Sequence, residues 1–169
     1  MFFSFVINLF VQLTNFVSGL DVWQQIIALI GIGTIPFIES YFGSFLGTLV
    51  GISPWLAVPM AVIGNLACML LLVHLAGRAR SAVLSSRQEG EATERNARQE
   101  RVARYMSRFG IPGVALLGAL VLPTQFTAPA LVALGADRRR VVLWMSISII
   151  IWGVGFGFFG LALISVTNA

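Results

Sequence analysis

Long apolar runs without a charged side chain constrain this chain more than any other feature of its sequence. Residues 2–20, 55–77 and 141–166 contain no Asp, Glu, Lys or Arg. A helix needs about 20 apolar residues to cross the hydrocarbon core of a bilayer, and each run is close to or above that length. Because membrane-spanning segments must satisfy their backbone hydrogen bonds internally, these runs predict an all-α membrane protein.

Composition agrees with that class and limits what else the chain can contain. Hydrophobic residues make up 57% of the 169 residues and charged residues only 11%, against about 25% in soluble domains. A chain of this length has room for one membrane domain, so we treat residues 1–169 as a single domain without a soluble catalytic part. The only cysteine, Cys68, provides neither a disulfide nor a thiolate metal site.

The positive charge of the chain is carried entirely by arginine, in two clusters. Eight arginines lie between Arg78 and Arg108, and the other three are residues 138–140. Beside long apolar runs, such clusters mark cytoplasmic loops rather than a nucleic-acid surface. Residues 78–108 also carry Glu and Arg four positions apart, which predicts a cytoplasmic amphipathic helix whose arginines contact anionic lipid head groups.

The segment of residues 24–53 is interrupted near its middle by Pro36 and Glu39. Each half is too short to span about 30 Å of hydrocarbon, which predicts a re-entrant helical hairpin; one long kinked helix is the alternative. Glycines recur every four residues in its second half, at Gly43, Gly47 and Gly51. Such a stripe lets another helix approach closely.

The segment of residues 109–137 has arginines before it and after it, so both of its ends should face the cytoplasm. It is too short for two full spans, and the sequence from Leu122 to Pro129, with prolines at both 123 and 129, would break a helix at its centre. These features predict that residues 109–137 form a second re-entrant hairpin. With full spans at 55–77 and 141–166, the chain becomes an inverted repeat of two hairpins, each followed by a transmembrane helix, which is a transporter architecture.

The N-terminal helix at residues 2–20 precedes this repeat. Its polar residues Asn8, Gln12 and Asn15 share one helical face, which we expect to point at neighbouring protein. Asp21 and Asp137 stand at segment ends, where we expect them to act as helix-end or head-group partners. His74 lies near the cytoplasmic edge, where a histidine more often caps or pairs than relays protons.

Glu39 is the only carboxylate inside the apolar part of the chain and away from a segment end. A charge near the bilayer centre is costly, so the neutral form is favoured until water or a cation arrives, which makes Glu39 a candidate for proton coupling. A hydrogen-bonded structural glutamate is the alternative. The candidate substrate-binding residues at the two hairpin tips are Pro36, Glu39, Pro123, Thr124, Gln125 and Thr127.

The sequence contains no recognisable arrangement of catalytic residues. It has no Gly-rich phosphate loop with Lys, no cluster at metal-ligand spacing, and no base beside a Ser or Cys nucleophile. We therefore expect a protein that is not an enzyme and that binds no metal or cofactor.

Several short motifs follow one another along residues 30–160: Ile35-Pro36-Phe37-Ile38-Glu39, Gly64-Asn65, Gly77-Arg78, Phe109-Gly110, Leu122-Pro123, Gly135 and Ile151-Trp152-Gly153. This order resembles the small multidrug export proteins and their wider relatives, the DedA/VTT superfamily. The resemblance implies two facing re-entrant hairpins and proton-dependent transport of drugs or polyprenyl-phosphate lipids. It also implies that Glu39 matches the acidic residue of the family's first hairpin. The DedA branch carries arginines in the second hairpin, where this chain has Thr124, Gln125 and Thr127, which favours the multidrug branch.

The sequence thus predicts a proton-coupled secondary transporter in the cytoplasmic membrane of a bacterium, exporting small amphiphilic or cationic compounds. Translocation of a polyprenyl phosphate or another lipid is one alternative, and a non-transporting membrane scaffold or assembly partner is another. The expected partners are protons, membrane lipids and the substrate, with no nucleic acid. We also expect a homo-oligomer, a dimer, because the glycine stripe and the pair Gly153 and Gly157 offer close-packing surface.

Overall fold

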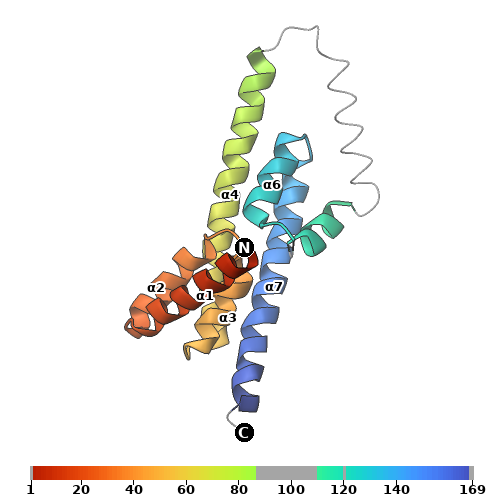
Figure 1. Cartoon of the computed structure of the whole chain (residues 1–169). Helices are drawn as coiled ribbons and strands as arrows, with labels where there is room; N and C mark the ends of the chain where they lie inside the picture. Colours follow the sequence, from red (N-terminus) through yellow and green to blue (C-terminus); the bar gives the residue numbers. More distant parts are fainter. Residues whose placement is uncertain (1, 87–109, 120, 168–169) are drawn as a thin grey trace. The chain divides into compact units, whose positions relative to one another are not determined.

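The computed structural model describes residues 2–86, 110–119 and 121–167, and these residues form helices and turns without a β-strand. The helices are α1 (Phe2–Ser18), α2 (Val22–Gly33), α3 (Glu39–Leu49), α4 (Pro54–Ser86), α6 (Thr124–Ala133) and α7 (Arg138–Thr167), with a further helical segment at residues 110–118 (Figure 1). The predicted all-α class is confirmed for the described residues.

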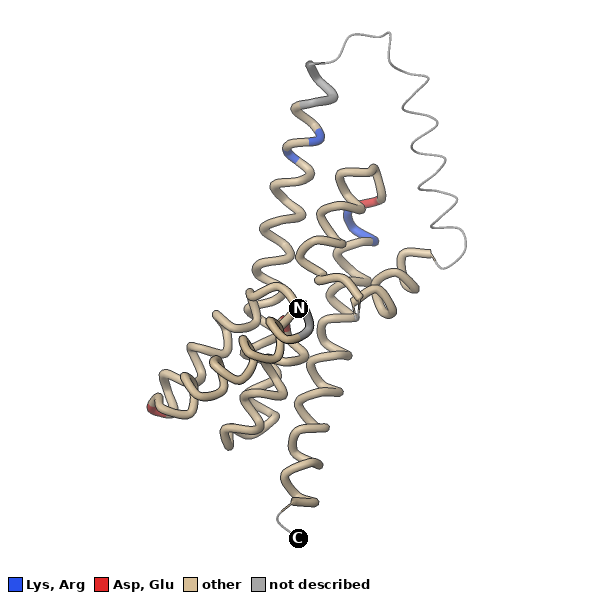
Figure 2. The backbone as a smooth tube through the Cα atoms, viewed as in Figure 1, with Lys and Arg blue, Asp and Glu red and all other residues tan. Residues whose placement is uncertain are grey.

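Two helices, over Pro54–Ala82 and Arg138–Thr167, are long and apolar enough to cross a membrane. They contain the predicted spans 55–77 and 141–166. Helix α4 continues beyond the predicted end because residues 78–86 include neither Gly nor Pro. Figure 2 shows arginine on α4 and at the start of α7, and among the described residues the other coloured positions are a few acidic residues. The rest of the predicted cytoplasmic helix 78–108 lies outside the described residues.

The chain divides into two compact units. Unit 1 contains Met1–Cys68 and Ile149–Ala169, and unit 2 contains Met69–Ser148. Unit 1 therefore holds α1, α2 and α3 with the first part of α4 and the last part of α7. Unit 2 holds the remaining parts of α4 and α7, with the helical segment at 110–118 and α6.

Helices α2 and α3 of unit 1 form a short antiparallel pair. They have 12 and 11 residues, or about 18 Å and 17 Å at 1.5 Å per residue, so neither can span the hydrocarbon alone. Gly43 of α3 faces Ile32, and Gly47 faces Leu29, so the residue numbers run in opposite directions. Segment 24–53 is thus a pair of packed helices rather than one kinked helix. That the pair is re-entrant stays a prediction.

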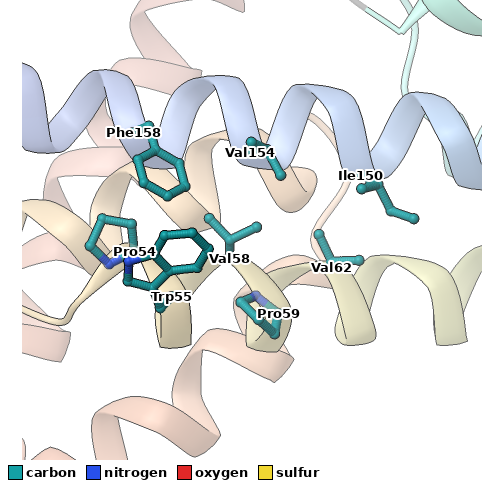
Figure 3. Close-up of a pocket in the computed structure, with 8 residues that line it drawn as sticks. All are labelled: Pro54, Trp55, Val58, Pro59, Val62, Ile150, Val154 and Phe158. Atoms are coloured by element: carbon teal, nitrogen blue, oxygen red, sulfur yellow. The ribbon is translucent and has the colours of Figure 1, made fainter.

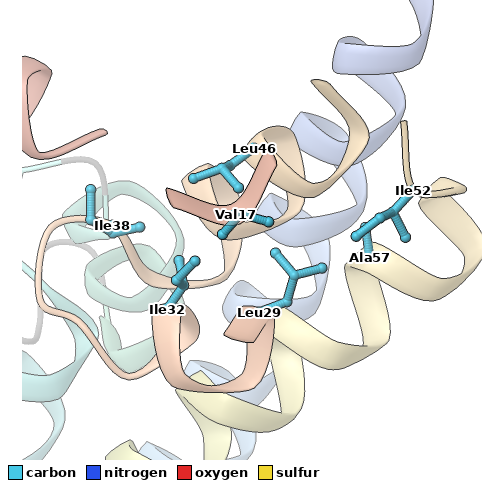
Figure 4. Packing of buried hydrophobic residues seen from close by; sticks show 7 residues of the cluster. All are labelled: Val17, Leu29, Ile32, Ile38, Leu46, Ile52 and Ala57. Carbon is cyan, nitrogen blue, oxygen red and sulfur yellow. The ribbon is translucent and has the colours of Figure 1, made fainter. Parts of the chain in front are cut away.

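A hydrophobic core joins α1 to this pair. Figure 4 shows its buried side chains, which are Val17, Leu29, Ile32, Ile38, Leu46, Ile52 and Ala57. Gln25 adds a polar link, because its side-chain amide donates to the carbonyl of Val17 at 3.0 Å. The core thus fixes the C-terminal end of α1 against α2.

The polar face of α1 does not point into this core. Its three amide residues Asn8, Gln12 and Asn15 are exposed, while Leu9, Phe10 and Leu13 on the opposite face pack against the core. The expectation that the amide face contacts neighbouring protein is wrong within this chain. The apolar face buries more hydrophobic area, and that area decides which side of the helix docks.

Glycines in α3 allow α4 to approach closely, as the stripe predicted. A Cβ on Gly47 would lie 2.8 Å from the Cβ of Ala57, and one on Gly43 would lie 3.1 Å from that of Ala61. Gly51 does not belong to this contact. It follows the end of α3 with φ of 93°, and a Cβ there would point into open space, so Gly51 serves to end the helix.

Within unit 1, the last part of α7 packs on α3 and α4 through its glycines. A Cβ on Gly153 would lie 2.9 Å from a methyl group of Val62 and 3.4 Å from the Cβ of Ser40, and one on Gly157 would overlap Val58. The glycines that suggested contacts between copies are therefore occupied within the chain. The homo-oligomer stays a prediction, and it needs another surface.

In unit 2 the helix break lies at the start of the segment 122–129, where the sequence predicted a break. Pro123 precedes α6 with φ of −53° and ψ of 138°, whereas Pro129 lies inside α6. Pro129 does not end the helix, because one missing hydrogen bond is tolerated where neighbouring helices stabilise the segment. The hydroxyl of Ser148 in α7 donates to the carbonyl of Ala115 at 2.7 Å and so ties the segment 110–118 to α7.

Polar residues at the helix ends behave as predicted. The backbone N–H of Asp21 donates to the side chain of Gln24 at 3.0 Å, and the Asp137 carboxylate accepts from the N–H of Arg140 at 2.8 Å. Near the Arg78 end of α4, the Arg138 guanidinium donates to Nδ1 of His74 at 3.3 Å. All three contacts are exposed.

Candidate functional site

The turn between α2 and α3 places Glu39 at the tip of the hairpin. The N–H of Glu39 donates to the carbonyl of Ile35 at 2.9 Å, and the fixed φ of Pro36 keeps the chain from continuing α2. Phe37 and Glu39 have φ of 70° and 51°. A φ in this range is uncommon for residues other than glycine, and the cost is about 1–3 kcal/mol per residue.

Tyr41 supports this strained turn, because its hydroxyl donates to the carbonyl of Phe37 at 3.1 Å. Its ring also contacts the rings of Phe42 and Phe156, with centroids 4.9 Å and 5.5 Å away. Residues in strained conformations persist only where their surroundings fix them, and they cluster at functional sites. The strain therefore makes this turn a candidate site, by an observation separate from the burial of the carboxyl group.

Glu39 is fully buried, with 1% of its surface exposed, and its neighbours Ile38 and Ser40 are at 0%. The hydroxyl of Ser40 donates to the carbonyl of Ile149 in α7 at 2.8 Å.

Three buried hydroxyl residues lie on α3, two of them bond to α7, and none was predicted from the sequence. Ser40, Ser44 and Thr48 recur every four residues and are all buried. Thr48 donates to the carbonyl of Gly157 at 3.1 Å, while the hydroxyl of Ser44 has no hydrogen-bond partner among the described residues. The spacing of small hydroxyl residues was the available signal, since it matches a close helix contact.

The other four predicted site residues lie together at the start of α6, in unit 2. Pro123, Thr124 and Gln125 are buried and Thr127 is partly buried. The hydroxyl of Thr127 donates to the carbonyl of Pro123 at 3.1 Å, which closes the first turn of α6. Pro36 and Glu39 are brought together in unit 1, and these four residues are brought together in unit 2. A contact between the two sets stays a prediction.

Unit 1 also contains an apolar groove between α4 and α7, which the sequence did not suggest. Its volume is about 400 Å³, and it is lined by Pro54, Trp55, Val58, Pro59, Val62, Ile150, Val154 and Phe158 (Figure 3). The rings of Trp55 and Phe158 meet edge to face at one end, with centroids 5.1 Å apart. Ligand sites commonly have volumes of about 300–1,000 Å³.

The lining of this groove is apolar and uncharged. Trp55 at one end is 78% exposed. Among the described residues there is no group of three or more His, Cys, Asp or Glu that could hold a metal ion.

Comparison with known proteins identifies one family. The family model described as "Putative small multi-drug export protein" matches residues 39–154, which is more than half of the chain and begins at Glu39. No curated protein and no solved structure gives a significant match.

Proposed function

This chain belongs to the small multidrug export protein family, and from that premise we propose that it is a proton-coupled secondary transporter that exports small amphiphilic or cationic compounds. The family and the two long apolar helices make it a membrane protein. We further propose that it resides in the cytoplasmic membrane of a bacterium, with several passes and two re-entrant hairpins. Transport rather than catalysis is the activity that its family name describes.

The observation that carries the proposal is the buried carboxyl group of Glu39 at a strained hairpin tip. Removing a carboxylate from water disfavours its charged form, so Glu39 holds a proton while the tip is closed. When water or a cationic substrate reaches the tip, the carboxylate becomes favourable and the proton leaves. Proton and substrate then compete for one site, which is the minimum requirement for exchange.

The apolar groove supports the amphiphilic nature of the substrate. Eight uncharged residues line it, so it accommodates the hydrophobic body of a ligand. Trp55 and Phe158 present aromatic faces at one end, where a cation within about 6 Å of a ring centroid is attracted. A lipophilic amine or quaternary cation fits this combination.

The contact between His74 and Arg138 supports the proposed orientation. It lies in unit 2, between the part of α4 that carries Arg78 and Arg80 and the first residue of α7. Arginines on two neighbouring helix ends favour the same side of the membrane, and that side is the cytoplasm by the positive-inside rule. The aromatic end of the groove, at the start of α4, would then lie toward the outer face.

Transport by purified protein in liposomes tests the proposal. Vesicles with an imposed pH gradient are loaded with ethidium, a fluorescent cation, and pyranine reports the proton flux. We expect wild-type vesicles to move ethidium and protons in opposite directions. Glu39→Gln should reduce the pH-driven flux to the level of empty vesicles, since the amide keeps the shape but binds no proton.

The matched control is Asp21→Asn, which changes an exposed carboxylate at a helix end and should transport at the wild-type rate. Circular dichroism and size-exclusion profiles must agree with wild type for both variants. If Glu39→Gln vesicles move ethidium at the wild-type rate, Glu39 is structural and the proposed coupling is wrong. If wild-type vesicles move neither ethidium nor other cations, the protein is a scaffold or transports another class of compound.

A second pair of variants tests the groove. Val154→Trp would fill the groove, whereas Ile151→Trp adds the same bulk to an exposed position of α7 outside the lining. We expect Val154→Trp to raise the KM for ethidium at least threefold with little change in maximal rate, and Ile151→Trp to leave both unchanged. Equal effects of the two variants would exclude the groove as a substrate site.

A further inference from the structure

The outward face of α1 carries an uncharged row of amide side chains. Asn8, Gln12 and Asn15 are all exposed, and they stand on the face opposite the core residues Leu9 and Leu13. The core face of α1 is firmly docked, because Phe10 packs on Phe42 and Phe45 with ring centroids 5.5 Å and 5.9 Å apart. The amide row therefore cannot turn inward by rotation of α1 without loss of these contacts.

Large apolar side chains flank the row on both sides. Phe5 and Phe16 lie along one side and are 62% and 60% exposed, and Ile7 and Val11 lie along the other and are 50% and 49% exposed. A face that meets water on a surface helix is typically rich in Lys and Arg, but residues 2–20 contain no charged side chain. The face is thus suited neither to water, because of its four large apolar residues, nor to lipid, because of its three amides.

A second copy of this chain can provide hydrogen bonds to the amide row and can bury the apolar side chains beside it. An amide carries two donors and an acceptor oxygen, so a row of amides complements an identical row. A two-fold dimer places the same surface on both partners. Polar residues within an apolar helix contact fix its register, and the flanking aromatic and aliphatic groups bury one another. The glycines of α3 and α7 are already used inside the chain, so they do not provide this surface.

We propose that two copies of this protein dimerise through α1, with the amide row of one copy against the amide row of the other. Gln12 lies at the centre of the row, between Asn8 and Asn15, so it meets its own counterpart whether the two helices run parallel or antiparallel. The apolar flanks close the contact on both sides. The inference does not depend on proton coupling or on the substrate.

Disulfide cross-linking of the purified protein in liposomes tests the geometry. In a Cys68→Ser background, Gln12→Cys should form a disulfide-linked species of twice the chain mass after mild oxidation, and reduction should reverse it. The matched control is Ile27→Cys on α2, which is exposed in unit 1 but lies outside the proposed contact. It should cross-link at least tenfold less.

A second measurement tests the amides without a cysteine. Labelled protein is diluted into an excess of lipid, and the dimer fraction is measured by single-molecule photobleaching. Combined replacement of Asn8, Gln12 and Asn15 by Ala should raise the dissociation constant at least tenfold, while Ile27→Ala should leave it unchanged. Circular dichroism checks that both variants fold.

Three results would overturn the proposal. The first is a monomer at all protein-to-lipid ratios. The second is equal cross-linking at positions 12 and 27, which indicates random collision. The third is rapid labelling of Gln12→Cys by a membrane-impermeant maleimide in intact vesicles, at the rate of an exposed loop cysteine, which indicates a face that meets water.

Discussion

The two proline-broken segments of this protein differ in how their backbones turn and in what they bury. The turn at residues 34–39 passes through Phe37 and Glu39, both with positive φ, and ends on a buried carboxyl group. The turn before α6 ends on Pro123 with an ordinary extended ψ and is followed by buried but neutral residues. In the described part of residues 110–133, positive φ occurs only at Gly110.

This difference suits the two segments to different tasks. A strained backbone with a buried carboxyl group can exist in two protonation states whose surroundings differ in energy, so it can couple a proton to a structural change. A relaxed turn with hydroxyl and amide groups can only donate and accept hydrogen bonds. We infer that the first hairpin responds to protons and that the second positions the substrate or the backbone.

The two segments also differ in how tightly they pack on α4, and this contrast gives the largest expected effect on stability. A Cβ on Gly64 would overlap the carbonyl of Ile30 in α2, with the carbonyl carbon 2.8 Å away. A Cβ on Gly77 would lie 4.0 Å from Val132 of α6, an ordinary contact. Gly64→Ala should therefore cost about 3 kcal/mol of the free energy of unfolding or prevent folding.

Gly77→Ala is the control within the same helix. It should leave stability unchanged or raise it by up to about 1 kcal/mol, because alanine favours the helix over glycine. Unfolding in increasing SDS, followed by circular dichroism, measures both variants. Equal losses would show that the two hairpins pack on α4 in the same way, which contradicts the contrast drawn from the glycine contacts.

The long helices and the breaks were predictable from sequence because they depend on length, charge and proline alone. Segments 55–77 and 141–166 had no alternative to helices of spanning length, and Pro36 and Pro123 fixed where the short segments turn. The partners of each face were not predictable. The amides of α1 share one face in any helix, but only the packing of the opposite face shows that they are exposed.

The candidate site was also predictable only in part. Glu39 stood out because it was the only carboxylate away from a segment end. Its strain could not be read from sequence, since positive φ at Phe37 depends on how the hairpin closes. The hydroxyls of Ser40 and Thr48 were missed because Ser and Thr are common in membrane helices, and their acceptors on α7 are more than 100 residues away in the chain.

The turn before α6 should contribute to substrate affinity, with an effect of intermediate size. Thr124→Val removes a hydroxyl but keeps the shape of a buried side chain. If this residue contacts the substrate, the KM for ethidium should rise about two- to tenfold, the value of one ordinary hydrogen bond. The dependence of transport on pH should remain that of wild type, because no proton-binding group has changed. A shifted pH profile would contradict the division of tasks between the two turns.

The smallest expected effect concerns a feature that the two hairpins share. In unit 1 the hydroxyl of Ser40 donates to the carbonyl of Ile149 at 2.8 Å, and in unit 2 the hydroxyl of Ser148 donates to the carbonyl of Ala115 at 2.7 Å. Each hydrogen bond ties one hairpin to α7. Both hydroxyls are fully buried, and the acceptors are main-chain carbonyls in both cases.

Ser40→Ala and Ser148→Ala should therefore destabilise the protein by similar amounts, about 0.5–1.5 kcal/mol each, since interhelical hydrogen bonds in membranes are worth little more than this. Ser18→Ala is the control, because the hydroxyl of Ser18 makes an exposed bond within its own helix, and it should change stability by less than about 0.5 kcal/mol. Unfolding in SDS measures all three. A loss at Ser40 several times that at Ser148 would mean that the first tip depends on this bond to hold its strained turn, and the difference between the hairpins would then extend to their attachment to α7.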